Sequence, residues 1–131
     1  MVIDTSALIA ILLAEPAGAA LLDAMQGTSK RIVSSVSLLE AGIVVRARSG
    51  AAAVPLLYDL VDGIGAEIAV FEEAQAKIAV AAFARFGKGM KHRAQLNFGD
   101  CAVYALAALR GEPILAVGRD FAATDLTLVR F

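Results

Sequence analysis

The segment Val2-Ile3-Asp4-Thr5-Ser6 decides the fold class of this chain. Its two apolar residues stop at an acid, and the periodic apolar segment 7–13 that follows predicts a helix. Asp, Thr and Ser often cap a helix N-terminus, because their side-chain oxygens accept hydrogen bonds from the free backbone N–H groups there. The segment therefore predicts a short strand that is followed directly by a capped helix.

The same alternation continues along the chain. Further strands are predicted at 31–34, 66–71 and 114–117, with an edge strand at 126–129. Between them the sequence predicts helices at 16–26, 36–48, 55–64, 72–86 and 100–109. Strands that alternate with helices favour an α/β fold with a mainly parallel sheet covered on both faces. No linker or repeat divides the chain, so we expect a single domain over residues 1–131.

Composition indicates a soluble protein with an apolar core and a partner. Of the 131 residues 59% are hydrophobic, but the longest unbroken apolar run, 101–109, is about half of a membrane-spanning helix. A domain of this size has limited interior for so many apolar side chains. We therefore expect no membrane contact, and either self-association or a bound partner.

The chain start and the cysteine content predict a cytoplasmic protein. No basic segment precedes the apolar stretch 7–14, and Glu15-Pro16 follows it in place of a cleavage site. The one cysteine, Cys101, excludes an intrachain disulfide and fits a reducing compartment. Because Cys101 opens an apolar run, we interpret it as a packing residue.

The overall charge excludes a protein that coats nucleic acid through bulk attraction. The net charge is −1 and the pI is about 5.8, so any RNA or DNA contact must come from a local patch. One segment contains basic side chains and no acid: Arg85, Lys88, Lys91, His92 and Arg93. The alternative interpretation is a solvated loop without a binding role. For His92 taken by itself we prefer this alternative, whereas for the cluster as a whole we prefer contact with RNA.

Four acids stand close to the predicted strand-to-helix or strand-to-loop junctions: Asp4, Glu40, Asp100 and Asp120. In a parallel sheet these junctions meet at one edge, where ligands bind. Two ionised carboxylates about 4 Å apart repel by about 4 kcal/mol at an effective dielectric near 20, so such a cluster favours a cation. Oxygen-only donors select Mg²⁺ or Mn²⁺ over zinc. Hydrolysis of a phosphodiester is a common use of such a site.

Each acid taken alone has a structural alternative. Asp4 and Asp100 are plausible helix caps, and Glu40 completes Ser37-Leu-Leu-Glu40, which has the spacing of a capping box. Glu40 nevertheless has apolar neighbours at helical spacing, which favours a site role. Asp120 is a plausible turn residue, as is Asp125. The chain has no GxGxxG, no GxxxxGK[ST] and no GxSxG, which removes support for dinucleotide, P-loop and serine-hydrolase chemistry.

Several motifs together resemble the PIN-domain family, and within it the VapC-type ribonuclease toxins of toxin-antitoxin pairs. The motifs are Asp4-Thr5-Ser6, Ser37-Leu-Leu-Glu40-Ala, Phe86-Gly87-Lys88-Gly89, Leu96-Asn97-Phe98-Gly99-Asp100-Cys101, Gly118-Arg119-Asp120-Phe121 and Thr124-Asp125. The similarity covers essentially the whole chain, and the Asn-Phe-Gly-Asp-Cys segment is its most specific part.

This resemblance implies a three-layer α/β/α sandwich with acids around Mg²⁺, or Mn²⁺, at the carboxyl ends of the strands. By position the acids are Asp4, Glu40, Asp100 and Asp120, with Asp125 the alternative for the last. Thr5 or Ser6 would support Asp4 or a phosphate by hydrogen bonds.

The activity implied is metal-assisted hydrolysis of structured RNA, a transfer or ribosomal RNA, with Lys88, Lys91 and Arg93 on the RNA backbone. The partners implied are a second copy of the chain and a cognate VapB-type antitoxin, whose C-terminal segment lies in a hydrophobic groove and blocks the site. Two alternatives stay open: a PIN-fold nuclease for DNA or RNA processing outside toxin-antitoxin systems, and a non-catalytic binding module.

Overall fold

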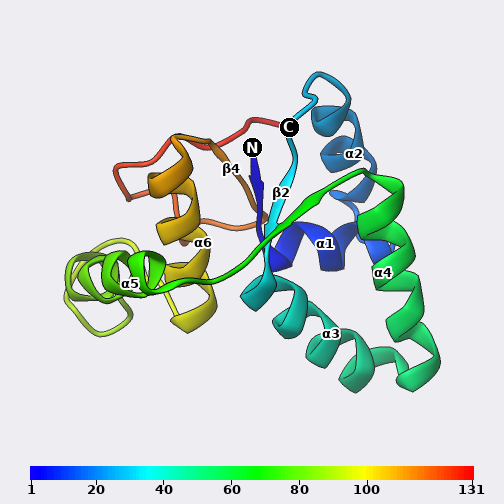
Figure 1. The fold of residues 1–131 in the computed structure, drawn as a ribbon, viewed down its shortest axis with the longest axis horizontal. Coiled ribbons are helices and arrows are strands. Elements are labelled where there is room, and N and C mark those ends of the chain that lie inside the picture. Colours follow the sequence, from blue (N-terminus) through cyan, green and yellow to red (C-terminus); the bar gives the residue numbers. More distant parts are fainter.

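A parallel sheet lies between two helical layers in the computed structural model, which describes residues 1–131 (Figure 1). The strands are β1 (Val2–Ile3), β2 (Ile32–Ser34), β3 (Glu67–Ala69) and β4 (Ile114–Leu115). The helices are α1 (Thr5–Leu12), α2 (Gly18–Gln26), α3 (Ser35–Ser49), α4 (Val54–Gly63), α5 (Glu73–Phe86) and α6 (Phe98–Arg110), with a 3₁₀ turn η1 (Ala51–Ala53) before α4.

The sheet has the strand order β3-β2-β1-β4, and every neighbouring pair is parallel. Successive residues of a strand point to opposite faces, so each strand supplies both cores. Val2, Ile32 and Ile114 belong to one core cluster, whereas Ile3, Val33 and Leu115 belong to the other. The predicted α/β fold and its three-layer arrangement are confirmed.

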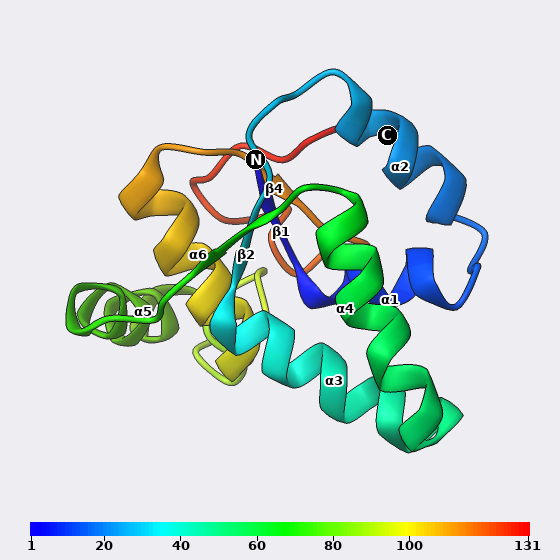
Figure 2. The same cartoon turned by 45° about the vertical axis from the view of Figure 1, so that its right-hand side comes forward.

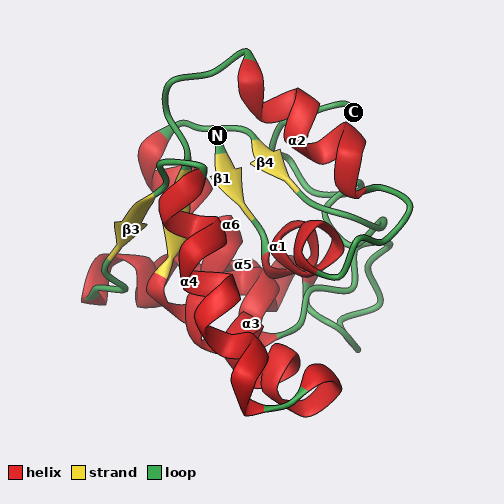
Figure 3. Ribbon diagram, turned by 90° about the vertical axis from the view of Figure 1, so that its right-hand side faces the viewer, coloured by secondary structure: helices red, strands yellow, loops and turns green.

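The helices divide between the two faces of the sheet. Helices α1 to α4 lie on one side and α5 and α6 on the other, and Figure 2 shows this division from a further direction, while Figure 3 shows the molecule from the α1–α4 side. Helix α6 is buried along most of its length and contacts β1, β2 and β4. Cys101 is buried in the core on this side, as the packing interpretation requires.

Local signals fix where the site-bearing helices begin. The Asp4 side chain caps α1 by accepting from the Ser6 N–H, and Ser34 caps α3 by accepting from the Val36 N–H. At α6, Asn97 and Asp100 form a reciprocal capping box. The alternative interpretation of Glu40 as part of a capping box at 37–40 is excluded, because α3 already begins at Ser35 and Ser37 lies inside it.

The predicted edge strand at 126–129 is also wrong as a strand. Only one bridge forms, from Leu128 to Ile114, through the hydrogen bonds Ile114 N–H to Thr127 O (2.9 Å) and Val129 N–H to Ile114 O (2.8 Å). Strand β4 is two residues long, so it offers too short an edge for a ladder. The strand expected at 66–71 is likewise shorter, and the helix expected from Pro16 begins at Gly18.

No helix combines the length and apolar content needed to cross a membrane.

Candidate active site

All four acids predicted from the sequence line one pocket, with a volume of about 270 Å³. Asp4 follows β1 and Asp120 lies five residues beyond β4, while Glu40 comes from α3 and Asp100 from the first turn of α6. The chain leaves β1 for β2 on one side, and β4 later pairs with its other side, so the pocket lies where the strand order reverses. Parallel sheets bind ligands at this position.

Asp4 is held by Ser6. The Asp4 Oδ2 atom accepts from the Ser6 backbone N–H at 2.9 Å and from the Ser6 hydroxyl. That hydroxyl oxygen also accepts from the Val117 N–H at 2.9 Å, which ties the end of β4 to the acid. Burial raises the pKa of Asp4 above its usual range, and the nearby charge of Glu40 acts in the same direction. Asp4 thus combines the capping role with a place in the pocket.

Glu40 is held by Thr5 and lies against Gly99 of α6. The Thr5 hydroxyl donates to Glu40 Oε2 at 2.7 Å, so the Thr5 side chain supports Glu40, whereas the Ser6 side chain supports Asp4. The Glu40 carboxylate lies against Gly99: a Cβ at that position would stand 2.5 Å from Oε2 and 2.9 Å from Oε1. Gly99 therefore leaves the space that Glu40 occupies. The glycine belongs to the Asn-Phe-Gly-Asp-Cys motif, but its role is seen only in the structure.

Asp100 is the third residue of α6 and faces the same pocket. Its Oδ2 atom accepts from the Asn97 N–H at 2.7 Å, and its own N–H donates to the Asn97 side chain at 3.0 Å. Burial raises the pKa of Asp100 to about 6, and the negative charges of Asp4, Asp120 and Glu40 add to the increase. The capping box leaves the other carboxylate oxygen free of protein partners.

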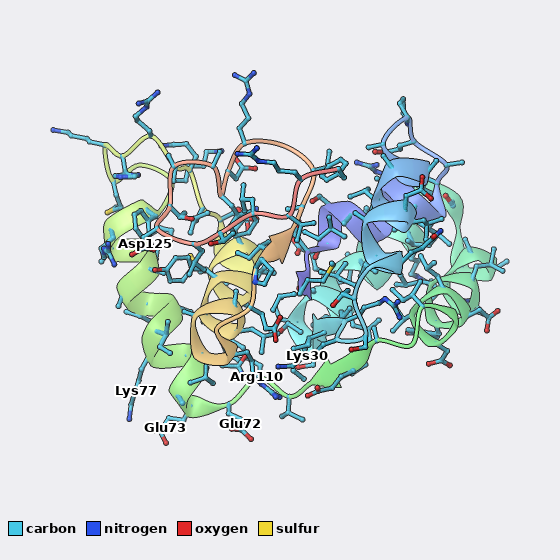
Figure 4. All side chains as sticks on the ribbon, turned by 90° about the horizontal axis from the view of Figure 1, so that it is seen from above. Lys30, Glu72, Glu73, Lys77, Arg110 and Asp125 are labelled. Carbon is cyan, nitrogen blue, oxygen red and sulfur yellow. The ribbon has the colours of Figure 1, made fainter.

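The structure separates Asp120 from Asp125. Asp120 is exposed in the turn after β4 and lines the pocket with the other acids. Asp125 lies outside the pocket and accepts from Arg85 at 3.0 Å and from the Tyr104 hydroxyl at 2.6 Å. These contacts hold the pKa of Asp125 below its usual range. Figure 4 shows Asp125 beside α5. The geometry therefore favours Asp120 as the fourth acid of the site.

The donor set fits a hard divalent cation. Every charged donor that faces the acidic end of the pocket is a carboxylate, and the two most buried ones both have raised pKa values. A cation would offset this accumulated negative charge. In the present side-chain arrangement no three acidic, histidine or cysteine side chains are positioned to hold a metal ion. Asp4, Glu40 and Asp100 instead accept hydrogen bonds from neighbouring protein groups.

Two charged residues of the pocket are missed by the sequence reasoning. Arg48, near the end of α3, and Glu15, after α1, line its far rim and lie 3.4 Å apart, nitrogen to oxygen. The spacing Glu40, Val44, Arg48 is the signal that could have found the arginine, because residues four apart share one side of a helix. All three line the pocket.

The basic loop lies outside the pocket. Lys88, Lys91 and Arg93 are exposed, and none of them lines the cavity. His92 has a structural role: its Nδ1 accepts from the Ala94 N–H at 3.0 Å, and its ring packs edge-on against Phe86. The loop is close to the site in sequence, because Asn97, which lines the pocket, follows it four residues after Arg93.

Comparison with known proteins gives the family. The family model for the PIN domain matches residues 1–126. The chain belongs to the PIN-domain family. Within that family this PIN domain is similar to the ribonuclease VapC28 of Mycobacterium tuberculosis, with 44% identity over 126 residues, 96% of this chain and 95% of that protein. The predicted family and its VapC branch are confirmed.

Solved PIN-fold toxins share the architecture. VapC20 of Mycobacterium tuberculosis, described as a Sarcin-Ricin loop cleaving toxin, superposes with a TM-score of 0.82 at 16% identity, covering 99% of this chain and 98% of that one. A toxin-antitoxin complex from Klebsiella pneumoniae gives a TM-score of 0.71 at 16% identity, covering 95% and 92%. At these identities the likeness establishes the fold alone.

Proposed function

We propose that this PIN domain, residues 1–131 acting as one unit, is a metal-dependent endoribonuclease and the toxin of a VapBC-type toxin-antitoxin pair. Membership of the family and the 44% identity to a VapC ribonuclease support the activity. The observation that carries the proposal is the pocket in which Asp4, Glu40, Asp100 and Asp120 meet. Its substrate class is structured RNA, either transfer RNA or ribosomal RNA.

Asp4, Asp100 and Asp120 would hold Mg²⁺ or Mn²⁺, with Glu40 as a further ligand or as the group that orients the attacking water. The bound cation lowers the pKa of water and offsets charge that develops on the phosphoryl oxygens. The protein supplies the orientation. Ser6 fixes Asp4, Thr5 fixes Glu40 and the capping box fixes Asp100, so these three carboxylates are positioned before substrate arrives.

Lys88, Lys91 and Arg93 hold the RNA backbone in this proposal. Their exposure and the absence of competing acids in the loop favour contact with phosphates. Such contacts release counterions, so RNA binding through this loop weakens as salt increases.

The proposed partners are a VapB-type antitoxin and a second copy of the chain. The antitoxin is supported by the likeness to a toxin-antitoxin complex. Self-association is supported by an apolar outer face that runs from α5 past the start of α6 to α3. Its most exposed side chains are Val80 (73% exposed), Phe98 (79%), Leu39 (65%) and Ile43 (61%). Monomeric proteins seldom leave such faces uncovered.

The first test is cleavage of total cellular RNA by wild-type protein and by Asp100→Asn, with Mg²⁺ and with EDTA, followed by mapping of the new 5′ ends. Discrete Mg²⁺-dependent cuts that the variant does not make are the expected result. A DNA substrate in the same assay tests the alternative of a DNA nuclease. Equal RNA patterns from both proteins would contradict the proposal.

A second test separates the enzyme from a binding module whose acids only cap helices. Mg²⁺ should raise the unfolding temperature of the wild type, because a ligand that binds only the folded state stabilises it. Asp4→Ala should abolish that increase. A cap alone loses about 1 kcal/mol on substitution and requires no metal. Stabilisation by Mg²⁺ that persists in Asp4→Ala would contradict the assigned ligands.

A further inference from the structure

The acidic pocket extends along helix α3 toward a basic side chain. Glu40, Val44 and Arg48 all line it, and their spacing places them on one side of the helix. Eight residues of helix correspond to about 12 Å of length. Val44 lies between Glu40 and Arg48 along this face of α3, and Ile9 of α1 also lines the pocket, so its wall between Glu40 and the Glu15–Arg48 pair includes apolar side chains.

Arg48 is the one cation that lines this pocket. Arg46 lies two residues earlier in the same helix turn but lines a different hollow, together with Leu39 and Tyr58. The basic loop does not reach the cavity either. The pocket has five carboxylates, and they repel an RNA strand that enters it. A cation inside the pocket offsets part of this repulsion and can attract a phosphate of the strand.

The ion pair between Arg48 and Glu15 is weak enough for another anion to replace Glu15. Its Nη1 atom lies 3.4 Å from Glu15 Oε1, and the two side chains are 58% and 41% exposed. Exposed pairs of this kind contribute little to stability. A phosphate offers a guanidinium two parallel hydrogen bonds, which is a better geometry than this long contact.

We propose that Arg48 binds a backbone phosphate of the RNA substrate on the α3 side of the cleaved bond, and that Glu15 competes with that phosphate for the guanidinium. The inference rests on the proposed ribonuclease function and adds a specificity-determining residue to it. Arg48 fixes the direction of the strand along the α1–α3 side of the pocket, while Ile9 and Val44 contact its sugar or base. In the free protein Glu15 holds the arginine at the rim.

Binding is measured separately from cleavage. All variants are made in the Asp100→Asn background, and their dissociation constants for a fluorescent single-stranded RNA of mixed sequence are determined by anisotropy over a range of salt. We expect Arg48→Gln to weaken binding about tenfold and to reduce the salt slope by about 0.7, the value for one phosphate on a single strand. Glu15→Gln should strengthen binding severalfold, because it releases the arginine.

Arg46→Gln is the matched control, since it removes the same charge from the same helix turn outside the pocket. Arg48→Lys retains the charge but loses the fork, and should give intermediate binding. Equal affinities for Arg48→Gln and Arg46→Gln would overturn the proposal. So would a loss of binding in Glu15→Gln equal to that in Arg48→Gln, because Glu15 would then be the functional group and Arg48 its positioning residue.

Cleavage by the same substitutions in the otherwise wild-type protein distinguishes this inference from the proposed function. If wild-type protein cleaves RNA and Arg48→Gln cleaves it with unchanged KM, the inference fails while the function stands. If wild-type protein does not cleave RNA but the predicted order of affinities is observed, the function fails while Arg48 remains an RNA-binding residue. Thermal unfolding confirms that each variant is folded.

Discussion

At the scale of single residues, the position of Glu40 depends on a missing side chain. The carboxylate occupies the space where residue 99 would carry a Cβ, and the Thr5 hydroxyl holds it there. Glycine at position 99 lies in the first turn of α6, one residue before Asp100. Two of the acids are therefore positioned by the same turn.

Gly99→Ala should reduce RNA cleavage by about a hundredfold, because a displacement near 1 Å of a positioned group has effects of that size. Stability should not fall, since alanine is the better helix residue by up to about 1 kcal/mol. Gly42→Ala is the control, because a Cβ at position 42 meets nothing within 4 Å. Cleavage rates compared under Mg²⁺ decide the prediction, and equal activity of the two variants would contradict it.

The pKa of Asp100 predicts an unusual pH dependence of the metal-free protein. Its ordinary value of 3.8 rises to about 6 in the folded state, so the folded protein holds a proton that the unfolded chain has released. The free energy of unfolding should therefore decrease as the pH rises from near 4 through about 6. The raised pKa of Asp4 acts in the same direction.

Urea unfolding in EDTA at pH about 5 and about 7 measures this effect, and Asp100→Asn should reduce it, with Asp4 responsible for the part that remains. Glu112, whose pKa is lowered to about 2, changes stability only below this window. If the free energy of unfolding of the wild type rises over the same interval, burial does not raise the pKa values of these carboxyl groups.

At the scale of elements, Asp125 joins three segments of the chain. Its carboxylate accepts from Arg85 at the end of α5 and from Tyr104 of α6, and burial raises the pKa of that tyrosine to about 12. The Arg85 guanidinium also lies 4.5 Å from the centroid of the Phe86 ring, which packs against Tyr104. The C-terminal segment is thus attached to the helices beside the basic loop.

Asp125→Ala should lower the free energy of unfolding by about 1 kcal/mol, since it leaves the Tyr104 hydroxyl without its acceptor while Arg85 remains solvated. Cleavage activity should persist. Asp120→Ala should give the reverse result, with little change in stability and loss of cleavage. Denaturation and cleavage assays on both variants test the pair, and loss of activity in Asp125→Ala alone would restore Asp125 as the fourth acid.

Local patterns made most elements predictable. The apolar pairs Val2-Ile3 and Ile114-Leu115 each fill both cores, and strand-to-helix alternation then requires parallel pairing. The failure at 126–129 has a nonlocal cause, because that segment depends on the length of β4. The capping pattern at 37–40 failed because Ser34, three residues earlier, already caps α3. Asp4 and Asp120 were predictable from strand ends, whereas Glu40 lies six residues into α3 and Asp100 lies in the first turn of α6, with no strand directly before that helix. Arg48 required knowing which face of α3 lines the pocket.

At the scale of the whole molecule, one outer face remains apolar. Between α5 and the start of α6 lies a hollow of about 340 Å³ lined entirely by apolar side chains, including Phe83 and Phe98. Phe98 also borders a second hollow against α3, so the face is continuous and ends beside Glu40. A projecting aromatic ring next to a hollow suits a two-fold pair, because each copy can fill the hollow of the other.

Val80→Glu should therefore convert a dimer into a monomer. The residue is 73% exposed, so the charge does not disturb the core of one copy. In a two-fold dimer both copies place it in an apolar interface, which should weaken association by at least about a hundredfold. Sedimentation equilibrium gives the dissociation constant. Leu56→Glu, on α4 at the opposite side of the molecule (Figure 1), introduces the same charge and should remain dimeric. A wild-type protein that sediments as a monomer, or a Val80→Glu variant that stays dimeric, would assign this face to a different partner.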